Sequence, residues 1–135
     1  MTTRIDLAWA GGQRFDAQDD AGVRLTLDGE RRSGVSPTEA LLSSLGACMG
    51  IDVVMILEKM RTDLQELRIS IEGDRPEDPP RYFRRLHIRF EVRGDVPRDK
   101  VERAVKLSFD KYCSVFHTLR KDLEVETSIA TVPEA

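Results

Sequence analysis

The chain has 135 residues, enough for one domain with a buried core. Charged side chains make up 33% of the sequence and the formal net charge is -3, which is ordinary for a globular protein. Because the sequence contains no basic block or Gly-Arg tract, this balance argues against a nucleic-acid partner.

Two further features bear on the cellular compartment. The longest uncharged apolar run extends from Ala40 to Ile51, holds serines and glycines, and is short for a bilayer-spanning helix. Arg4, Asp6 and Asp16 interrupt any apolar region of a signal peptide near the N-terminus. We therefore expect a cytoplasmic protein with no membrane partner, in which a structural disulfide is disfavoured.

Three short strands are predicted before the first helix. Apolar and polar residues alternate in Arg4–Ala10, which predicts a strand with one buried face. A Gly11-Gly12 turn leads to a second strand over Gln13–Ala17, and a third follows over Val23–Leu27. These strands read as a meander.

A long helix is predicted from Ser36 to Arg61. Ser36 is the expected N-cap, Pro37 the first helical residue, and Glu39 the third position of a capping box. The absence of charge in its first turns indicates that most of this part of the helix is buried. Its small residues leave room for another backbone to approach closely; these are Ser43, Ser44, Gly46, Ala47 and Gly50.

The remaining segments complete an α+β pattern. A strand at Leu67–Ile71, a proline-containing connection over 73–82 and a strand at Leu86–Val92 predict a hairpin. Pro97 opens a second helix, a third is expected from Ser114 to Lys121, and a closing strand from Leu123 to Ile129. The expected order is β-β-β-α-β-β-α-α-β, in a single domain over residues 1–135.

The two cysteines are the residues that could carry chemistry. His87 and His117 fit no metal-binding spacing, and no glycine-rich phosphate loop follows a strand. Cys48 lies within the long helix, where a cysteine serves either as a small core residue or as a nucleophile. Cys113 is at the start of the third predicted helix, where the helix dipole favours a thiolate.

The sequence around both cysteines resembles the OsmC/Ohr family of thiol-dependent peroxidases. The resemblance rests on SPTEALLSSLGACMGIDVV, on DKYCSV further along the chain, and on the early Trp9-Ala10-Gly11-Gly12 turn. It implies an intertwined homodimer with two central cysteine helices, where Gly46, Ala47 and Gly50 allow close approach.

The family's chemistry implies a role for each cysteine. Cys48 matches the peroxidatic thiolate, which attacks a hydroperoxide and becomes a sulfenic acid. Cys113 matches the second cysteine, which condenses with it to a disulfide. An external dithiol then reduces the disulfide, so no cofactor or metal is implied.

The family also activates its thiolate with an arginine from an early loop, paired with a glutamate at the head of the cysteine helix. Arg14 and Glu39 are the candidates by position, with Arg31 and Arg32 as rivals. Both are offset by one residue from the well-characterised hydroperoxidases, and Glu39 is equally explained as a capping residue. Asp52, one turn after Cys48, must be neutralised or turned away, because a carboxylate raises a thiol pKa.

Three functions remain open from the sequence. The first is a peroxidase that reduces organic or inorganic hydroperoxides in oxidative stress defence. The second is a dimeric protein that binds ligands in an apolar pocket with little turnover. The third is a structural α+β domain with incidental cysteines.

Overall fold

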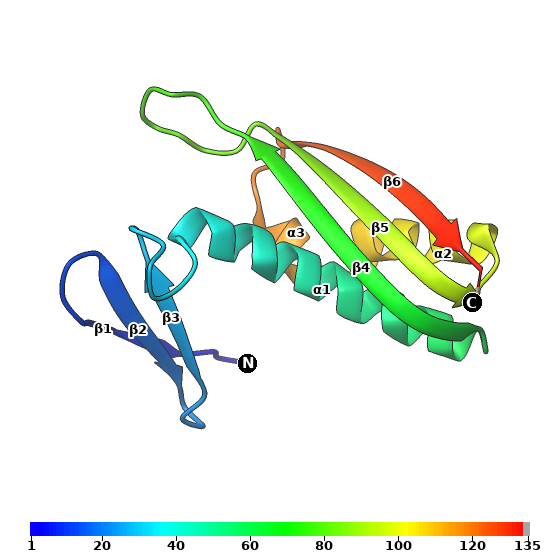
Figure 1. The fold of residues 1–135 in the computed structure, drawn as a ribbon, viewed down its shortest axis with the longest axis horizontal. Helices are drawn as coiled ribbons and strands as arrows, with labels where there is room; N and C mark the ends of the chain where they lie inside the picture. Colours follow the sequence, from blue (N-terminus) through cyan, green and yellow to red (C-terminus); the bar gives the residue numbers. More distant parts are fainter. Residues whose placement is uncertain (134–135) are drawn as a thin grey trace. The chain divides into compact units, whose positions relative to one another are not determined.

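The structure, a computed structural model, describes residues 1–133. Its elements are β1 (Ile5–Trp9), β2 (Arg14–Asp19), β3 (Arg24–Asp28), α1 (Pro37–Lys59), β4 (Asp63–Asp74), β5 (Arg85–Asp95), α2 (Arg98–Leu107), the π-helical turn η1 (Ser108–Tyr112), α3 (Ser114–Thr118) and β6 (Glu124–Val132) (Figure 1). This confirms the predicted α+β fold and element order. The turn η1 was not predicted, and α3 is shorter than expected.

The chain divides into two compact units, Met1–Ser43 and the residues from Ser44 onward. The division falls within α1, so this helix belongs to both units. Whether residues 1–135 act as one domain stays a prediction.

The first unit contains the antiparallel sheet β1-β2-β3. The expected meander is present, but the expected buried face of β1 is not. Ile5, Leu7 and Trp9 are 54%, 53% and 68% exposed, because nothing in the described chain covers them. Ala17 of β2 is the buried apolar residue of this sheet.

A carboxylate at the end of β3 organises the loop that follows. Asp28 is 6% exposed, and its side chain accepts hydrogen bonds from the backbone N–H groups of Glu30, Arg32 and Ser33 and from the Ser33 hydroxyl. These donors, the Ser33 N–H first, lower the pKa of Asp28 to about 2. The loop they hold includes Arg31, whose backbone has a positive φ of 60°.

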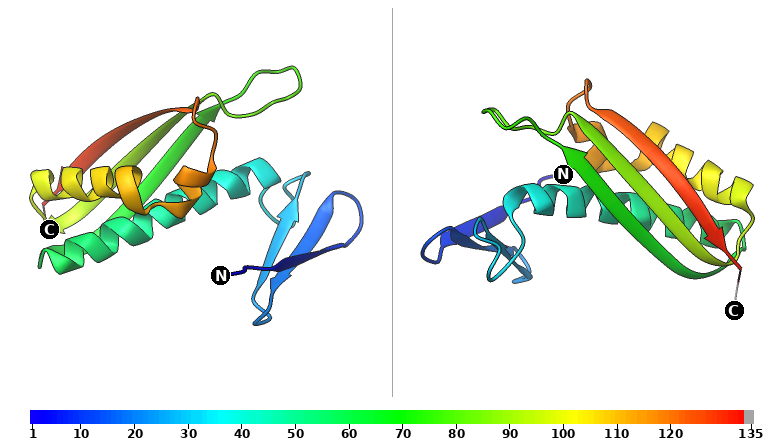
Figure 2. Two further views of the ribbon diagram at one scale, coloured as in Figure 1. Left: turned by 180° about the vertical axis from the view of Figure 1, so that it is seen from behind. Right: turned by 45° about the horizontal axis from the view of Figure 1, so that its top comes forward.

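The second unit is a three-stranded sheet with helices on one face (Figures 1 and 2). Strand β5 is central, antiparallel to β4 and parallel to β6. The alternation predicted for β5 is confirmed, because its apolar residues are all buried: Leu86, Ile88, Phe90 and Val92. The chain between β5 and β6 carries α2, η1 and α3.

Helix α1 packs closely on β4 through two glycines. A Cβ atom added to Gly46 would lie 3.0 Å from Cδ1 of Ile71, and one added to Gly50 would lie 3.0 Å from Cδ1 of Ile69. These glycines therefore serve packing within the chain, where the sequence analysis assigned them to an interface between two helices. Ala47, the third small residue of that set, is exposed.

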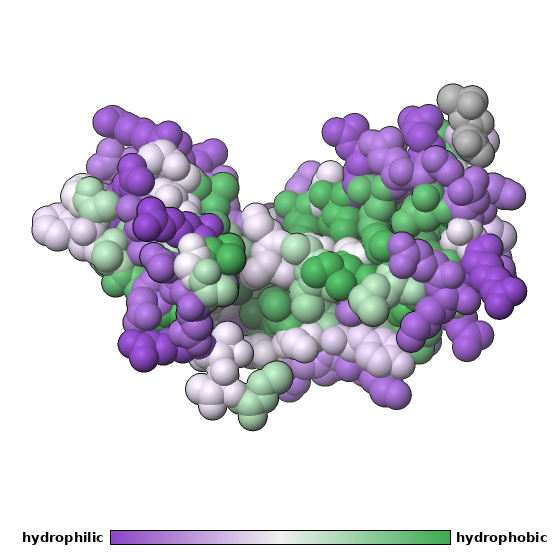
Figure 3. All heavy atoms as spheres, turned by 90° about the horizontal axis from the view of Figure 1, so that it is seen from below, coloured by the Kyte–Doolittle hydropathy of each residue, from purple (hydrophilic) through white to green (hydrophobic). Residues whose placement is uncertain are grey.

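Much of α1 is uncovered in the single chain, contrary to the expectation from its lack of charge. Its buried residues are Leu45, Gly46, Met49, Gly50, Val53 and Leu57. By contrast, Ile51 is 60% and Met55 53% exposed. Apolar side chains consequently gather on the face of the second unit seen in Figure 3.

Among the described residues, α1 is also the one helix whose length and composition are compatible with crossing a bilayer. The expectation of no membrane partner rested on the short uncharged run alone. The length and composition of the whole helix do not exclude a membrane span. A core helix has the same properties, and α1 packs against β4 through Gly46 and Gly50.

The contact between Gly46 and Ile71 predicts a non-additive pair of substitutions. Ile71→Val removes Cδ1 and should itself cost about 0.5–1.5 kcal/mol. We expect Gly46→Ala to be less destabilising in the Ile71→Val background than in the wild type, by about 0.5 kcal/mol or more. Urea unfolding of the four proteins measures this coupling. Gly50→Ala, which meets Ile69, is the matched control and should be additive with Ile71→Val; equal coupling for both glycines would contradict the assignment.

The Asp28 carboxylate predicts acid sensitivity. Its pKa is about 2 in the folded chain, below the ordinary value of 3.8. Its contribution to the free energy of unfolding is therefore complete above about pH 4 and is lost as the pH falls toward about 2. Asp28→Asn should be less stable at pH 6 and should show a shallower loss of stability between pH 4 and pH 2, measured by urea unfolding. A pH profile parallel to that of the wild type would contradict this.

Candidate functional site

The two cysteines come from distant parts of the sequence and meet in the second unit. Cys48 lies on α1 and is partly exposed, and Cys113 immediately precedes α3 and is 0% exposed. Both are free thiols, and the Cys48 side chain is a hydrogen-bonding neighbour of the Cys113 thiol. The structure therefore brings together two sulfur atoms whose proximity sequence physics alone could not establish.

Backbone contacts at the end of η1 hold Cys113 in place. The Cys113 N–H donates to the Ser108 carbonyl oxygen at 2.8 Å, and the Phe116 N–H donates to Cys113 Sγ at 3.4 Å. The His117 N–H donates to the Cys113 carbonyl oxygen at 3.1 Å, and His117 Nδ1 lies 2.7 Å from the same oxygen. The Phe116 ring packs edge-on against Phe109, with ring centroids 4.8 Å apart. Cys113 is thus the N-cap of α3, and its sulfur accepts the capping hydrogen bond.

Burial controls the ionisation of this thiol. It raises the pKa of Cys113 from 9.0 to about 11, despite the opposing hydrogen bond from the Phe116 N–H. The Cys48 side chain and the Asp52 carboxylate contribute to this rise, after burial. The Phe116 N–H at the start of α3 favours the Cys113 thiolate, as expected for a helix start, but desolvation outweighs this contact of the five-residue helix.

Asp52 is not turned away from the cysteines, and its carboxylate is held by a hydroxyl group. Its Oδ2 atom accepts a hydrogen bond of 2.8 Å from the hydroxyl of Ser108, a residue that is 0% exposed. This contact joins α1 to the first residue of η1. The carboxylate that the sequence analysis regarded as a departure from the family pattern is thus part of the cysteine environment.

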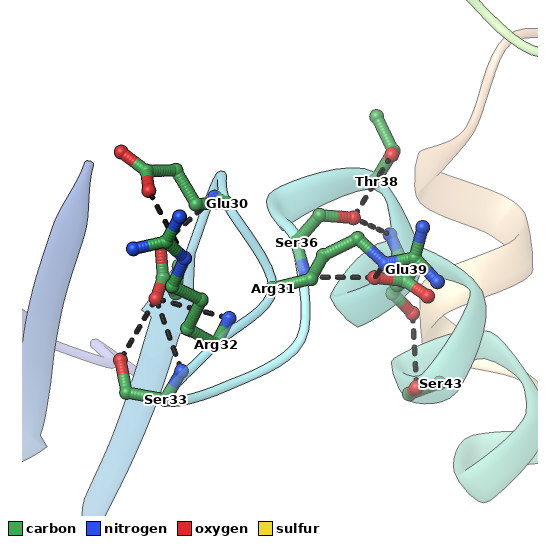
Figure 4. Close-up of polar contacts among 9 residues, drawn as sticks. Glu30, Arg31, Arg32, Ser33, Ser36, Thr38, Glu39 and Ser43 are labelled. Carbon is green, nitrogen blue, oxygen red and sulfur yellow. Dashed lines mark hydrogen bonds and ion pairs between the residues drawn. The ribbon is translucent and has the colours of Figure 1, made fainter.

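In the first unit, Glu39 completes a capping box and also pairs with an arginine (Figure 4). Its Oε1 atom accepts the Ser36 N–H at 2.9 Å, and the Glu39 N–H donates to Ser36 Oγ at 3.3 Å, which completes the capping box. The same Oε1 atom lies 3.2 Å from Nε of Arg31. The Ser36 N–H, the Ser36 hydroxyl and Arg31 together lower the pKa of Glu39.

Arg14 has a different partner. Its Nε atom lies 3.1 Å from Oδ1 of Asp16, two residues along β2. The predicted Arg14–Glu39 pair is thus not formed within the chain, and Arg31, one of the rivals, occupies that position. The other rival, Arg32, pairs with Glu30 at 3.5 Å.

A groove of about 700 Å³ lies in the second unit. Its apolar lining includes Met55, Ile56, Met60, Leu107 and Tyr112. Asp52 contributes to the wall of the groove, as do Lys59 and Arg103. Tyr112, the residue immediately before Cys113, lines this groove and is 49% exposed.

Sequence reasoning missed Ser108. The sequence analysis assigned no role to this residue. The available signal was a lone hydroxyl at an otherwise apolar position, which needs a hydrogen-bond acceptor when it is buried. Asp52 was noticed, but no rule of spacing connects residues 52 and 108.

Comparisons with known proteins agree with this fold. The family model described as OsmC-like protein matches residues 28–128. Protein YhfA from Escherichia coli (strain K12) is 36% identical over 126 residues, which is 92% of this chain and 94% of that protein. A hypothetical protein from Aquifex aeolicus VF5 has a similar solved structure, with a TM-score of 0.91, 30% identity and coverage of 100% and 99% of the two chains.

The fold extends to more distant proteins. One is described as an organic hydroperoxide resistance protein OsmC, predicted redox protein, from Legionella pneumophila. Its structure has a TM-score of 0.70 at 17% identity and covers 96% of this chain and 97% of its own. At this identity the likeness concerns the fold alone, whereas the family model covers most of the present sequence. The chain belongs to the OsmC-like protein family.

Proposed function

We propose that this protein is a thiol-dependent peroxidase of the cytoplasm that reduces organic hydroperoxides and contributes to oxidative stress defence. The observation that carries the proposal is the contact between the free thiols of Cys48 and Cys113. The name of the Legionella relative, an organic hydroperoxide resistance protein, supports the substrate class. An external dithiol is the proposed reductant.

The proposed cycle balances with these two sulfur atoms. The Cys48 thiolate attacks one peroxide oxygen, the O–O bond breaks, and the leaving alkoxide takes a proton to become an alcohol. The Cys113 sulfur then attacks the Cys48 sulfenic acid; the S–O bond breaks, and the thiol proton leaves with the hydroxyl group as water. Two thiol–disulfide exchanges with the dithiol restore both cysteines.

The different environments of the cysteines support this division of roles. The nucleophile that attacks peroxide must be a thiolate and must be reached by the substrate. Cys113 is fully buried, and its pKa of about 11 keeps it a thiol at neutral pH. Cys48 is partly exposed and is the better candidate for the first step.

A cation near Cys48 would favour its thiolate, and we propose that Arg31 supplies this charge from a second copy of the chain. Glu39, which pairs with Arg31, precedes Cys48 by nine residues in α1. In an α-helix this separation is about 14 Å along the axis and about 180° around it. At this spacing, the Arg31 that pairs with Glu39 is poorly placed to stabilise the Cys48 thiolate of its own chain.

The exposed apolar surfaces support a homodimer. Ile5, Leu7 and Trp9 in the first unit and Ile51 and Met55 in α1 are each more than half exposed. Burying such a side chain contributes roughly 1.5–3 kcal/mol. A dimer in which a second copy covers these residues would therefore be strongly stabilised. A monodisperse monomer by light scattering at micromolar concentration would contradict the dimer.

The alternative function is binding without turnover. The groove of about 700 Å³ with a largely apolar lining favours it, because its size suits a small organic ligand. In that case the cysteine contact would have no catalytic consequence, and peroxide consumption would not depend on Cys48.

Cysteine variants test the peroxidase. With cumene hydroperoxide and a dithiol, we expect Cys48→Ser to lose at least a hundredfold in rate, because it removes the nucleophile. Cys113→Ser should accumulate Cys48 sulfenic acid, detected by dimedone labelling and mass spectrometry. Labelling of Cys113 in Cys48→Ser would instead reverse the two roles, and wild-type consumption in Cys48→Ser would favour the binding protein.

A mixed dimer tests the proposed source of the cation. Arg31→Ala should slow peroxide reduction more at pH 7 than at pH 9, because alkali supplies thiolate without a cation. Co-expressed Cys48→Ser and Arg31→Ala chains, carrying different tags, should form a heterodimer with about half the wild-type activity. One of its sites has both Cys48 and Arg31 if the arginine acts between copies. Arg14→Ala is the matched comparison, and loss in that variant alone would restore Arg14 as the candidate.

A further inference from the structure

A partly buried hydrogen bond links the helix that carries Cys48 to the turn that ends at Cys113. Its donor is the Ser108 hydroxyl and its acceptor is Oδ2 of Asp52, at 2.8 Å. Ser108 is 0% exposed, and no described buried side-chain polar atom is without a partner. Leaving the Asp52 carboxylate without this donor would cost free energy, because part-buried charged groups need their hydrogen bonds.

The positions of the four residues make this link relevant to the cysteine pair. Asp52 follows Cys48 by four residues and lies on the same side of α1. Ser108 begins η1, and its carbonyl oxygen accepts the Cys113 N–H at 2.8 Å, where the turn ends. One residue therefore contacts α1 through its side chain and Cys113 through its backbone. π-Helical turns are uncommon and occur frequently at functional sites.

We propose that Asp52 and Ser108 are positioning residues for the resolving thiol, because their hydrogen bond fixes η1 in the conformation that presents Cys113 to Cys48. This inference deepens the proposed peroxidase function and concerns only its second step. Neither residue attacks peroxide, and neither reacts with sulfur. They act on the second step through the geometry and ionisation of Cys113.

The two parts of the effect are separable. The hydrogen bond holds the turn, while the negative charge of Asp52 opposes ionisation of Cys113. The other titratable groups in contact with Cys113 are Cys48 on α1 and His117 on α3, the latter through the carbonyl oxygen. Asn at position 52 would keep an oxygen acceptor and remove the charge, whereas Ala would remove both.

Reaction with 5,5′-dithiobis(2-nitrobenzoate) measures the two cysteines in sequence without peroxide. Cys48 attacks the reagent disulfide and releases one thionitrobenzoate. Cys113 then loses its proton to solvent, attacks the Cys48 sulfur of the mixed disulfide and releases the second thionitrobenzoate. The first absorbance phase reports Cys48 and the second reports Cys113, which Cys113→Ser should abolish.

We expect Ser108→Ala and Asp52→Ala to slow the second phase by about tenfold to a hundredfold, since small misplacement of reacting groups has effects of this size. In Ser108→Ala, which keeps the Asp52 carboxylate, the first phase should stay within about twofold of the wild type. Asp52→Asn should rescue the second phase and shift its pH profile toward lower pH. Asp110→Asn, which removes a carboxylate from the exposed side of the same turn, is the matched control and should change neither phase.

Three results would overturn the inference. They are an unchanged second phase in Ser108→Ala, equal slowing of both phases with a lowered Tm, or an Asp52→Asn protein as slow as Asp52→Ala. The expected phases together with no peroxide consumption would leave the inference intact and reject the peroxidase. The experiment therefore distinguishes failure of this inference from failure of the proposed peroxidase function.

Discussion

The close packing of α1 on β4 is the constraint on which the cysteine site depends. Gly46 and Gly50 are four residues apart, so they lie on one side of the helix and let it approach Ile71 and Ile69. Cys48 is midway between them, about 200° around the helix from each. A helix held this way directs Cys48 away from β4, and its contact with Cys113 follows.

In the proposed cycle, the two thiols have opposite requirements. A nucleophile needs its thiolate form, whereas a resolving cysteine is better kept as a thiol until its partner has been oxidised. Burial of Cys113 and the nearby Asp52 carboxylate both disfavour its thiolate. The same carboxylate accepts the hydrogen bond from Ser108. Asp52 therefore affects both the position and the ionisation of Cys113.

The fold was largely predictable because its signals are local. Alternation identified β5, and Ser36, Pro37 and Glu39 marked the start of α1, since strand periodicity and capping depend on neighbouring residues. The family resemblance identified Cys48 and Cys113 as a pair. Their side-chain contact could not be predicted from the sequence. It depends on η1, and no pattern in the sequence indicates the π-helical hydrogen bonds of this turn.

The burial of apolar strands and the arginine partner were harder to predict for a different reason. Alternation in β1 indicates which face is apolar but not which chain covers it, and in the single chain Trp9 is exposed. Similarly, Arg14 was the residue nearest to the position of the family's activating arginine. In the structure, however, it pairs with Asp16, two residues away on the same strand. Short-range pairs of this kind are decided by side-chain geometry.

The parallel pairing of β5 and β6 has a consequence for the order of folding. Parallel neighbours need a crossover connection, and here the crossover consists of α2, η1 and α3, with Cys113 on it. Such non-local strand pairing forms slowly because a long loop must close first. Cys113 is therefore anchored at both ends of its segment only after the last strand has joined the sheet. The topology therefore makes the anchoring of Cys113 depend on the pairing of β6 with β5.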